Sequence, residues 1–295
     1  MRWRSPLVAA WEGRGTYREL AGHRTFTIDL GASETETLEP LLVVHGFPSS
    51  SFDYHHVVDT LAEHRRVLLF DMIGYGLSAK PDLPYTIDLQ ADVAEAFVTD
   101  AGVSTLAMLT HDLGDTVGGE LLARQADGRW PVEVTRRVLT NGSIYIEMAH
   151  LSAGQLLLLS LPDERLPESA GIDGATMQAS LAATFSPRSL VDRDVLAAEW
   201  ELVSHLGGHL LLPRTIRYIE ERRRREGRYT GAIESHSSTL AIVWGTDDPI
   251  AVPTMASKLS DVRPDATLTW LAGVGHYPMI EAPSAFLDAV TAALR

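Results

Sequence analysis

Short apolar runs recur along the chain and are separated by longer segments with helical spacing. Residues 41–44 and 67–70 contain only Leu, Val and Phe, which is typical of strands buried on both faces. Further strand-like segments occupy residues 103–109, 134–139, 240–244 and 267–271. Because amphipathic segments such as residues 86–101 lie between them, the pattern predicts an α/β fold with a mostly parallel sheet and helices on both faces.

Two parts of the chain depart from this alternation. Residues 17–20 and 25–30 are rich in β-branched and aromatic side chains around a glycine turn, which predicts an antiparallel hairpin. Residues 142–236 show helical patterns broken by Pro and Gly and contain no strand-like run. A helical insertion of this kind predicts a lid over the carboxyl ends of the strands. We therefore predict a core domain of residues 1–141 and 237–295 and a lid of residues 142–236.

Composition narrows the classes of function. The chain has 295 residues, 45% of them hydrophobic, and a formal net charge of −14, which argues against binding to nucleic acid or to anionic membranes. The absence of cysteine excludes disulfides, thiolate-bound metals and cysteine nucleophiles. The apolar segment 156–161 is far shorter than the roughly 20 residues that cross a bilayer. We expect a soluble, cytoplasmic protein.

One strand, turn and helix carries a candidate nucleophile. The run ending at residue 109 is followed by His111-Asp112-Leu113-Gly114 and then by a helical pattern, so Asp112 would stand at the tip of an abrupt turn. A carboxyl group with a reference pKa of about 3.9 is ionised at pH 7 and needs no base to become a nucleophile. It can attack an sp³ carbon and form an ester.

Two later loops supply partners for Asp112. Asp248 follows the strand at residues 240–244, and His276 follows the strand at residues 267–271, which gives the chain order nucleophile, acid, histidine. His276 would activate water to hydrolyse the ester, and Asp248 would orient the imidazole and stabilise its charged form. Asp247 and Glu147 are the alternative orienting acids.

The chain resembles the α/β-hydrolase superfamily and, within it, the epoxide hydrolases. The subgroup that is most similar is the one around mesoderm-specific transcript protein, which shares the elbow from His111 to Val117 and Tyr218-Ile219-Glu220 before a basic run. The motifs that carry the resemblance are His45-Gly46-Phe47-Pro48, Asp71-Met72-Ile73-Gly74-Tyr75-Gly76-Leu77-Ser78, His111-Asp112-Leu113-Gly114 and Gly275-His276.

The resemblance implies an α/β-hydrolase fold and an epoxide hydrolase that needs no cofactor and no metal. It places the oxyanion hole at the backbone N–H groups of Phe47 and Leu113, and its spacing selects Asp248 over Asp247. A lid tyrosine, Tyr218, would protonate the epoxide oxygen. Many members use a second lid tyrosine, for which Tyr145 is the best candidate. The substrates would be water and a mainly apolar epoxide, because Leu156 to Leu159 lie in the lid.

Other functions remain open at this stage. A haloalkane dehalogenase also uses an aspartate nucleophile, but neither Leu113 nor Phe47 has a side chain that can donate a hydrogen bond to a halide. A non-catalytic binding protein would not need Asp112, Asp248 and His276 together. A serine esterase is excluded because no Gly-x-Ser-x-Gly elbow is present. The basic residues 222–225 are expected to form a solvated face of a lid helix, and a homodimer remains open.

Overall fold

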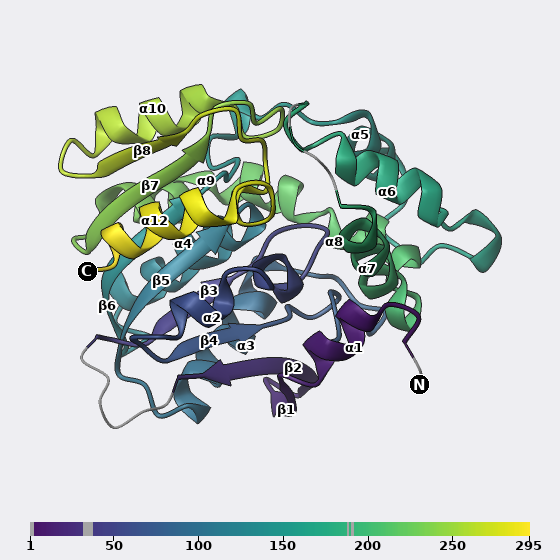
Figure 1. The fold of residues 1–295 in the computed structure, drawn as a ribbon, viewed down its shortest axis with the longest axis horizontal. Helices are drawn as coiled ribbons and strands as arrows, with labels where there is room; N and C mark the ends of the chain where they lie inside the picture. The colour runs from purple at the N-terminus through teal and green to yellow at the C-terminus, as the bar shows by residue number, and fades with distance from the viewer. Residues whose placement is uncertain (1–2, 32–37, 188, 190–191) are drawn as a thin grey trace.

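The computed structural model describes residues 3–31, 38–187, 189 and 192–295. Within them, eight strands form one sheet in the order β1-β2-β4-β3-β5-β6-β7-β8 (Figure 1). The strands are β1 (Thr16–Leu20), β2 (His23–Leu30), β3 (Leu41–Val44), β4 (Val67–Phe70), β5 (Thr105–His111), β6 (Glu133–Thr140), β7 (Thr239–Gly245) and β8 (Thr267–Leu271). The pairs that involve β2 are antiparallel, and the strands from β4 to β8 pair in parallel. The predicted mostly parallel sheet is confirmed.

The hairpin at the amino-terminal edge of the sheet is also confirmed. Thr16 pairs with Thr27 and Leu20 with His23. The turn between the strands consists of Ala21 and Gly22, which have φ angles of 48° and 79°. Two successive residues with positive φ form the tight turn that matches the twist of an antiparallel pair. The glycine supplies one of these conformations without steric strain.

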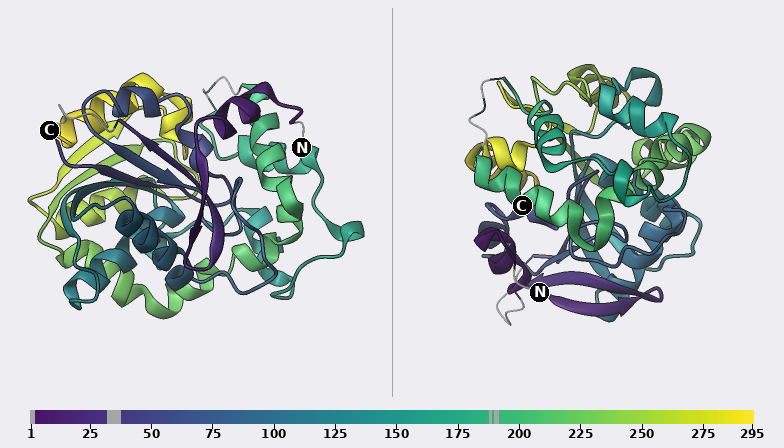
Figure 2. Two further views of the ribbon diagram at one scale, coloured as in Figure 1. Left: turned by 90° about the horizontal axis from the view of Figure 1, so that it is seen from below. Right: turned by 90° about the vertical axis from the view of Figure 1, so that its right-hand side faces the viewer.

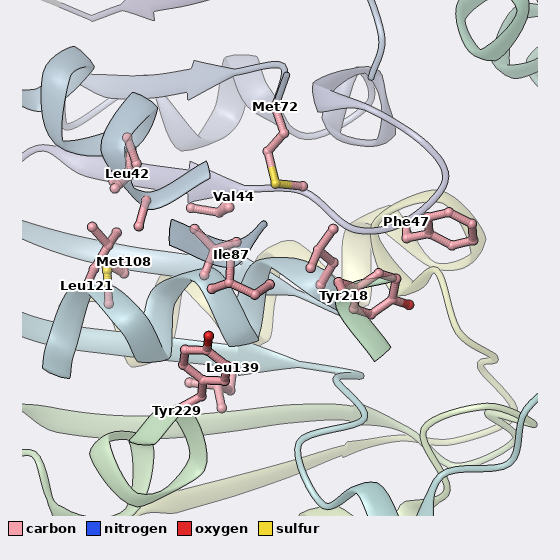
Figure 3. Close-up of a cluster of buried hydrophobic side chains, with 14 of the residues drawn as sticks. Leu42, Val44, Phe47, Met72, Ile87, Met108, Leu121, Leu139, Tyr218 and Tyr229 are labelled. Carbon is pink, nitrogen blue, oxygen red and sulfur yellow. The ribbon is translucent and has the colours of Figure 1, made fainter. Parts of the chain in front are cut away.

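Strands β3, β4, β5 and β7 alternate between two hydrophobic clusters on opposite faces of the sheet. Leu42 and Val44 of β3 pack into one cluster, together with residues of α3 (Ile87–Asp100), α4 (Leu113–Ala126), α9 (Tyr218–Ser235) and α10 (Pro253–Val262); Figure 3 shows part of it. Leu41 and Val43 pack into the other, with residues of α2 (Val58–Leu61) and α12 (Pro283–Ala293). This alternation is the period of two that a strand buried on both faces requires.

The inserted helices gather beyond one end of the sheet, at the right of Figure 1 and facing the viewer in the right-hand view of Figure 2. They are α5 (Ala153–Ser160), α6 (Gly174–Ala182), α7 (Arg193–Ser204) and α8 (Leu212–Thr215). The short 3-10 helices η1 (Ser51–Tyr54), η2 (Ile146–Met148), η3 (Glu168–Ala170) and η4 (His205–Leu210), and α11 (Pro278–Glu281), lie in connecting loops.

The last helix of the predicted lid packs on the core. Helix α9 runs along α4, and a Cβ atom added at Gly119 of α4 would lie 2.7 Å from the backbone oxygen of Tyr229. Only glycine permits so close an approach of the two helices. The segment 142–236 therefore contains both the helices over the strand ends and one helix of the layer that covers the sheet.

The apolar pattern did not predict one helix, α1 (Pro6–Glu12), which packs on α7. Ser5 caps it through a hydrogen bond to the N–H of Leu7, and Pro6 occupies the first turn. Its buried residues are Val8 and Trp11. Among the described residues, no helix has the length and apolar character needed to cross a membrane.

Candidate active site

The chain turns sharply between β5 and α4, and Asp112 occupies the turn. Its backbone has φ 49° and ψ −112°, a conformation that costs a non-glycine residue about 1–3 kcal/mol. A Cβ atom at Gly114 would lie 2.3 Å from the oxygen of Val44, and one at Gly46 would lie 2.8 Å from the Cβ of Asp112. Gly114, which follows the turn, and Gly46, in the neighbouring loop after β3, therefore leave space for the strained turn. This is the arrangement that the predicted strand, turn and helix require.

The carboxylate of Asp112 is held by the backbone of the loop after β3. The N–H of Phe47 donates to Asp112 Oδ2 at 2.9 Å. Leu113 is the first residue of α4, so its N–H is one of the amino-terminal donors that a helix leaves free. The two predicted oxyanion-hole residues thus flank the candidate nucleophile.

His276 and Asp248 form a buried pair. His276 Nδ1 lies 2.9 Å from Asp248 Oδ2. Burial disfavours the charged ring, but the carboxylates of Asp248 and Asp112 outweigh this effect and raise the pKa of His276 to about 9. The structure brings Asp112, Asp248 and His276 together from three separate loops.

Asp248 is fixed by three donors besides the histidine. Its Oδ1 accepts hydrogen bonds from the N–H groups of Ile250 and Ala251 at 2.8 and 3.0 Å. Its Oδ2 accepts from the side-chain amide of Asn141 at 2.7 Å. Asn141 directly follows β6 and has φ 49°, a conformation that asparagine tolerates better than most residues. The sequence reasoning missed this role, although an Asn-Gly pair directly after a strand signals such a conformation.

Two further histidines support the turns. His111 Nε2 lies 2.7 Å from the backbone oxygen of His276; a carbonyl only accepts, so this nitrogen carries the proton. Burial, together with the nearby His276, lowers the pKa of His111 to about 4. His45 Nε2 accepts from the N–H of Met72 at 3.0 Å. Both rings are therefore neutral and hold the backbone of neighbouring loops through hydrogen bonds.

Tyr218 begins α9 and lies beside the nucleophile's loop. Its ring centroid is 5.5 Å from that of Phe47, and Figure 3 shows the two rings next to each other. Burial and the charge of Asp112 raise the pKa of Tyr218 well above its usual value, while Arg222 and a hydrogen bond with the Gln155 side chain act in the opposite direction. Tyr218 is therefore protonated at neutral pH.

Tyr145, the second predicted lid donor, faces away from this site. Its hydroxyl donates to Glu234 Oε1 at 2.8 Å, and Lys258 Nζ lies 3.8 Å from its ring centroid. The structure therefore does not bring Tyr145 to Asp112. Its place at the start of the segment 142–236 could be read from the sequence, but the direction of its side chain depends on how the loop packs against α9.

A pocket lies between the inserted helices and the strand ends and is partly open to solvent, with about 820 Å³ of space when the open part is included. Asp112 and His276 lie in its wall, and most of the other lining side chains are apolar, among them Leu157, Met177 and Ile250. A smaller set is polar and comes from α5, α6 and their flanks: Ser152, Gln155, Thr176, Ser180 and Thr184. A concave, mainly apolar site with a few polar groups is typical of small-molecule binding.

Comparison with known proteins agrees with this geometry. Residues 41–289 match the model of the alpha/beta hydrolase family. The chain belongs to this family. It is 35% identical to the putative hydrolase LipZ of Mycobacterium tuberculosis over 291 residues, which are 98% of this chain and 99% of that protein.

Two other relatives bear on the sequence-based predictions. The chain is 30% identical to the mesoderm-specific transcript homolog protein of Bos taurus, over 97% of this chain and 87% of that protein, which confirms the resemblance to that subgroup. The solved structure of the epoxide hydrolase CorEH superposes with a TM-score of 0.72 at 15% identity, over 95% of this chain and 97% of that one. At that identity the likeness extends to the fold alone.

Arg222 is a further residue that the sequence pattern placed wrongly. The run 222–225 is expected from its charge to be solvated, and Arg223 and Arg224 are exposed, but Arg222 is only 1% exposed. Its guanidinium donates to Thr116 Oγ1 at 2.7 Å and to the backbone oxygen of Ser143 at 2.9 Å. The hydrolase therefore has a buried cation directly behind its elbow.

A buried pair of acidic side chains links α7 to the core. Asp53 lies in η1 and Glu199 in α7, and both are buried. Burial raises the pKa of Asp53 to about 7, although Ser49 donates to it at 2.6 Å. Burial and the charge of Asp53 raise the pKa of Glu199 well above its usual value. At neutral pH the pair holds a proton.

Among the described residues, no three His, Asp or Glu side chains are grouped as ligands for a metal ion.

Proposed function

We propose that this hydrolase converts an epoxide into a vicinal diol through an ester of Asp112. The observation that carries the proposal is the carboxylate of Asp112 at the tip of the elbow, with one oxygen bound to the N–H of Phe47 at 2.9 Å. An ionised carboxylate in this position attacks a carbon atom without help from a base. A buried, protonated tyrosine beside it supplies the acid that an epoxide needs.

The first step opens the ring. Because Phe47 holds Oδ2, Oδ1 of Asp112 attacks an epoxide carbon, and the bond from that carbon to the ring oxygen breaks. The electron pair passes to the ring oxygen, which takes the proton of the Tyr218 hydroxyl. Gln155 lines the pocket and hydrogen-bonds Tyr218, so its amide is placed to support the same oxygen.

The second step hydrolyses the ester. His276 removes a proton from water, which attacks the carbonyl carbon of the ester, and the N–H groups of Phe47 and Leu113 stabilise the resulting oxyanion. When the oxyanion collapses, the bond from the carbonyl carbon to the diol oxygen breaks, and that oxygen takes the proton from His276. The charge of Asp112 contributes to the raised pKa of His276 in the resting enzyme. Esterification removes that charge, so the pKa of His276 falls when the ring has to accept a proton.

The pocket favours a mainly apolar epoxide. Apolar side chains form most of its wall, and those of α5, α6 and the loop after β7 are among them. Burial of an apolar substrate is favourable by about 25 cal/mol per Å². The hydroxyl groups of Ser152, Thr176, Ser180 and Thr184 offer contacts to one polar end of the substrate. An aryl or alkyl epoxide with a single polar substituent fits this distribution.

A haloalkane dehalogenase is the second candidate, because Asp112 can attack a halogenated carbon in the same way. Phe47 and Leu113 flank Asp112, and their side chains carry no N–H group for a departing halide. Tyr218 and Gln155 are suited to an oxygen that gains a proton. The alternative predicts halide release from 1-bromobutane and no diol from styrene oxide.

The test is one turnover of styrene oxide with excess enzyme in water enriched in the heavy oxygen isotope. The ester mechanism gives an unlabelled diol and heavy oxygen in the Asp112 peptide, because water attacks the protein carbonyl. A labelled diol with an unlabelled peptide would exclude the ester. His276→Gln should trap the ester, visible by intact-protein mass, whereas His64→Gln, at an exposed position, should turn over normally. A broad panel with neither diol nor halide would favour a binding protein.

A further inference from the structure

Arg222 lies beside both Asp112 and Tyr218, the residues between which negative charge moves in the proposed reaction. It is one turn of α9 after Tyr218, and its Cζ is 5.0 Å from the centroid of the tyrosine ring. Its Nη2 is 3.5 Å from the backbone oxygen of Asp112. The same guanidinium therefore contacts the nucleophile's backbone and the face of the candidate proton donor.

The environment of Arg222 leaves its charge available to the site. Within the described residues, no carboxylate lies within ion-pairing distance of its guanidinium. Asp115 interacts with it electrostatically, but burial raises the pKa of Asp115 well above its usual value, although Thr110 hydrogen-bonds it. Burial thus favours the neutral form of Asp115, which carries no negative charge. The elbow's other carboxyl group belongs to Asp112, whose backbone oxygen lies 3.5 Å from the guanidinium.

Ring opening displaces the negative charge of that carboxyl group. Asp112 loses its charge when its oxygen bonds the epoxide carbon, and Tyr218 gains a charge when its proton passes to the leaving oxygen. After the step, the negative charge is on the Tyr218 oxygen, and solvent returns a proton to it as the ester is hydrolysed. A fixed cation in contact with both residues stabilises both states without reorganisation.

We propose that Arg222 is a positioning residue that acts through Tyr218, as the countercharge for the phenolate that forms when the ring opens. The inference rests on the proposed function. It gives a physical reason why this chain can open an epoxide with Tyr218 as its single lid tyrosine. In epoxide hydrolases with two lid tyrosines, the second hydroxyl stabilises the phenolate; in this chain a buried cation does so. Gln155, which hydrogen-bonds Tyr218, acts in the same direction.

A purely structural role is the alternative. Through Thr116 and Ser143, Arg222 ties α9 to α4 and to the loop after β6. Loss of these bonds would displace Asp112 and slow its attack on every electrophile. A countercharge role would slow only those reactions in which Tyr218 gives up its proton. The two roles therefore differ in their dependence on the leaving group.

The test follows ester formation in the His276→Gln background by intact-protein mass, with styrene oxide and with benzyl bromide. The oxygen of styrene oxide needs a proton, and bromide does not. Arg222→Met should slow ester formation from styrene oxide about 100-fold and leave that from benzyl bromide within about threefold. Adding Arg222→Met to Tyr218→Phe should produce no further loss with styrene oxide, because the two residues act as a unit.

Three matched variants complete the design. Arg222→Lys keeps the charge and should retain most of the styrene oxide rate, whereas Arg222→Gln keeps hydrogen bonding without charge and should be as slow as Arg222→Met. If Arg222→Met does not fold, the comparison of Arg222→Lys with Arg222→Gln provides the same test. Arg223→Met removes an exposed arginine from the same helix and should change neither rate.

Several outcomes would overturn the inference. Equal slowing with both electrophiles, equal rates for Arg222→Lys and Arg222→Gln, or additive losses with Tyr218→Phe would assign Arg222 a structural role. Ester formation from benzyl bromide but not from styrene oxide in the His276→Gln parent would reject epoxide hydrolysis itself. The inference would then fall with it.

Discussion

Asn141 donates its side-chain amide to the oxygen of Asp248 that also faces His276, at 2.7 Å. Its own Oδ1 accepts from the N–H of Gly245 at 3.2 Å. Asn141 therefore connects the loop after β6 to the loop after β7 and sets the angle at which Asp248 meets the imidazole.

We predict that Asn141→Gly slows the second step selectively. Glycine keeps the backbone at positive φ without strain, so the variant removes mainly the hydrogen bond to a charged group, worth about 1.5–3 kcal/mol. Ester hydrolysis should fall about 10-fold or more, while ester formation stays close to normal. Rapid-quench measurement of the ester should show that it accumulates. A variant that slows formation and leaves hydrolysis intact would contradict the role of Asn141.

Tyr218→Phe should slow ring opening. Removal of a positioned acid costs about 10²–10⁴-fold in rate, whereas hydrolysis of an ester already formed should be nearly unaffected. Tyr145→Phe is the matched control, because the Tyr145 hydroxyl donates to Glu234 and does not face Asp112. Single-turnover kinetics with styrene oxide separate the two variants. Equal losses in both would restore Tyr145 as a second donor.

The Asp53–Glu199 pair should make stability depend on pH. A carboxyl group whose pKa is raised on folding contributes stability that is present below its unfolded pKa of about 4 and is lost as pH rises through its folded value. For Asp53 that value is about 7. His276, with a pKa of about 9, adds a loss of the same sign at higher pH, so the pair has to be isolated by mutation.

Glu199→Gln isolates the pair because its amide donates to Asp53 at every pH. Relative to the parent, the variant should be more stable by about 1–3 kcal/mol at pH 8.5, and the difference should shrink toward pH 5. Urea unfolding at both pH values measures it. Glu63→Gln, at an exposed position, is the control. A difference independent of pH would mean that the pair does not share a proton.

Gly119→Ala should disturb both stability and chemistry. The added methyl group would lie 2.7 Å from the backbone oxygen of Tyr229, so α9 has to shift, at a cost of about 1–3 kcal/mol. Because α9 carries Tyr218 and Arg222, ring opening should slow as well. At Gly231 of the same helix, no described heavy atom lies within 4 Å of the corresponding position. Gly231→Ala should therefore leave activity unchanged; thermal unfolding and single-turnover assays distinguish the two.

Local signals in the sequence are enough to predict the sheet and the triad. Runs such as residues 41–44 and 67–70 are apolar because the sheet buries their strands, and they coincide with β3 and β4. Asp112, Asp248 and His276 each follow such a run within a few residues, and parallel strands bring their carboxyl ends to one edge. The order of the three loops along the chain is therefore sufficient to predict that these side chains meet.

Other features of the site and the fold depend on tertiary packing and could not be predicted from the sequence. Arg222 sits in a run of four arginines, and only the contact of α9 with α4 determines which of them is buried. The partners of Tyr145, Asp53 and Glu199 come from elements far away in the sequence. Helix α1 is short and capped by Ser5, and its apolar side becomes apparent only against α7.

Because α9 packs on the core, the residues that react and the residues that select the substrate lie on different helices. Tyr218 and Arg222 stand on a helix held against α4, whereas α5 and α6 supply part of the apolar wall of the pocket, including Leu157 and Met177. Mutations of these apolar residues can thus diversify the range of substrates while the reacting groups keep their places. In an evolving lineage, substitutions in α5 and α6 can change substrate specificity while the residues on α9 keep the enzyme active.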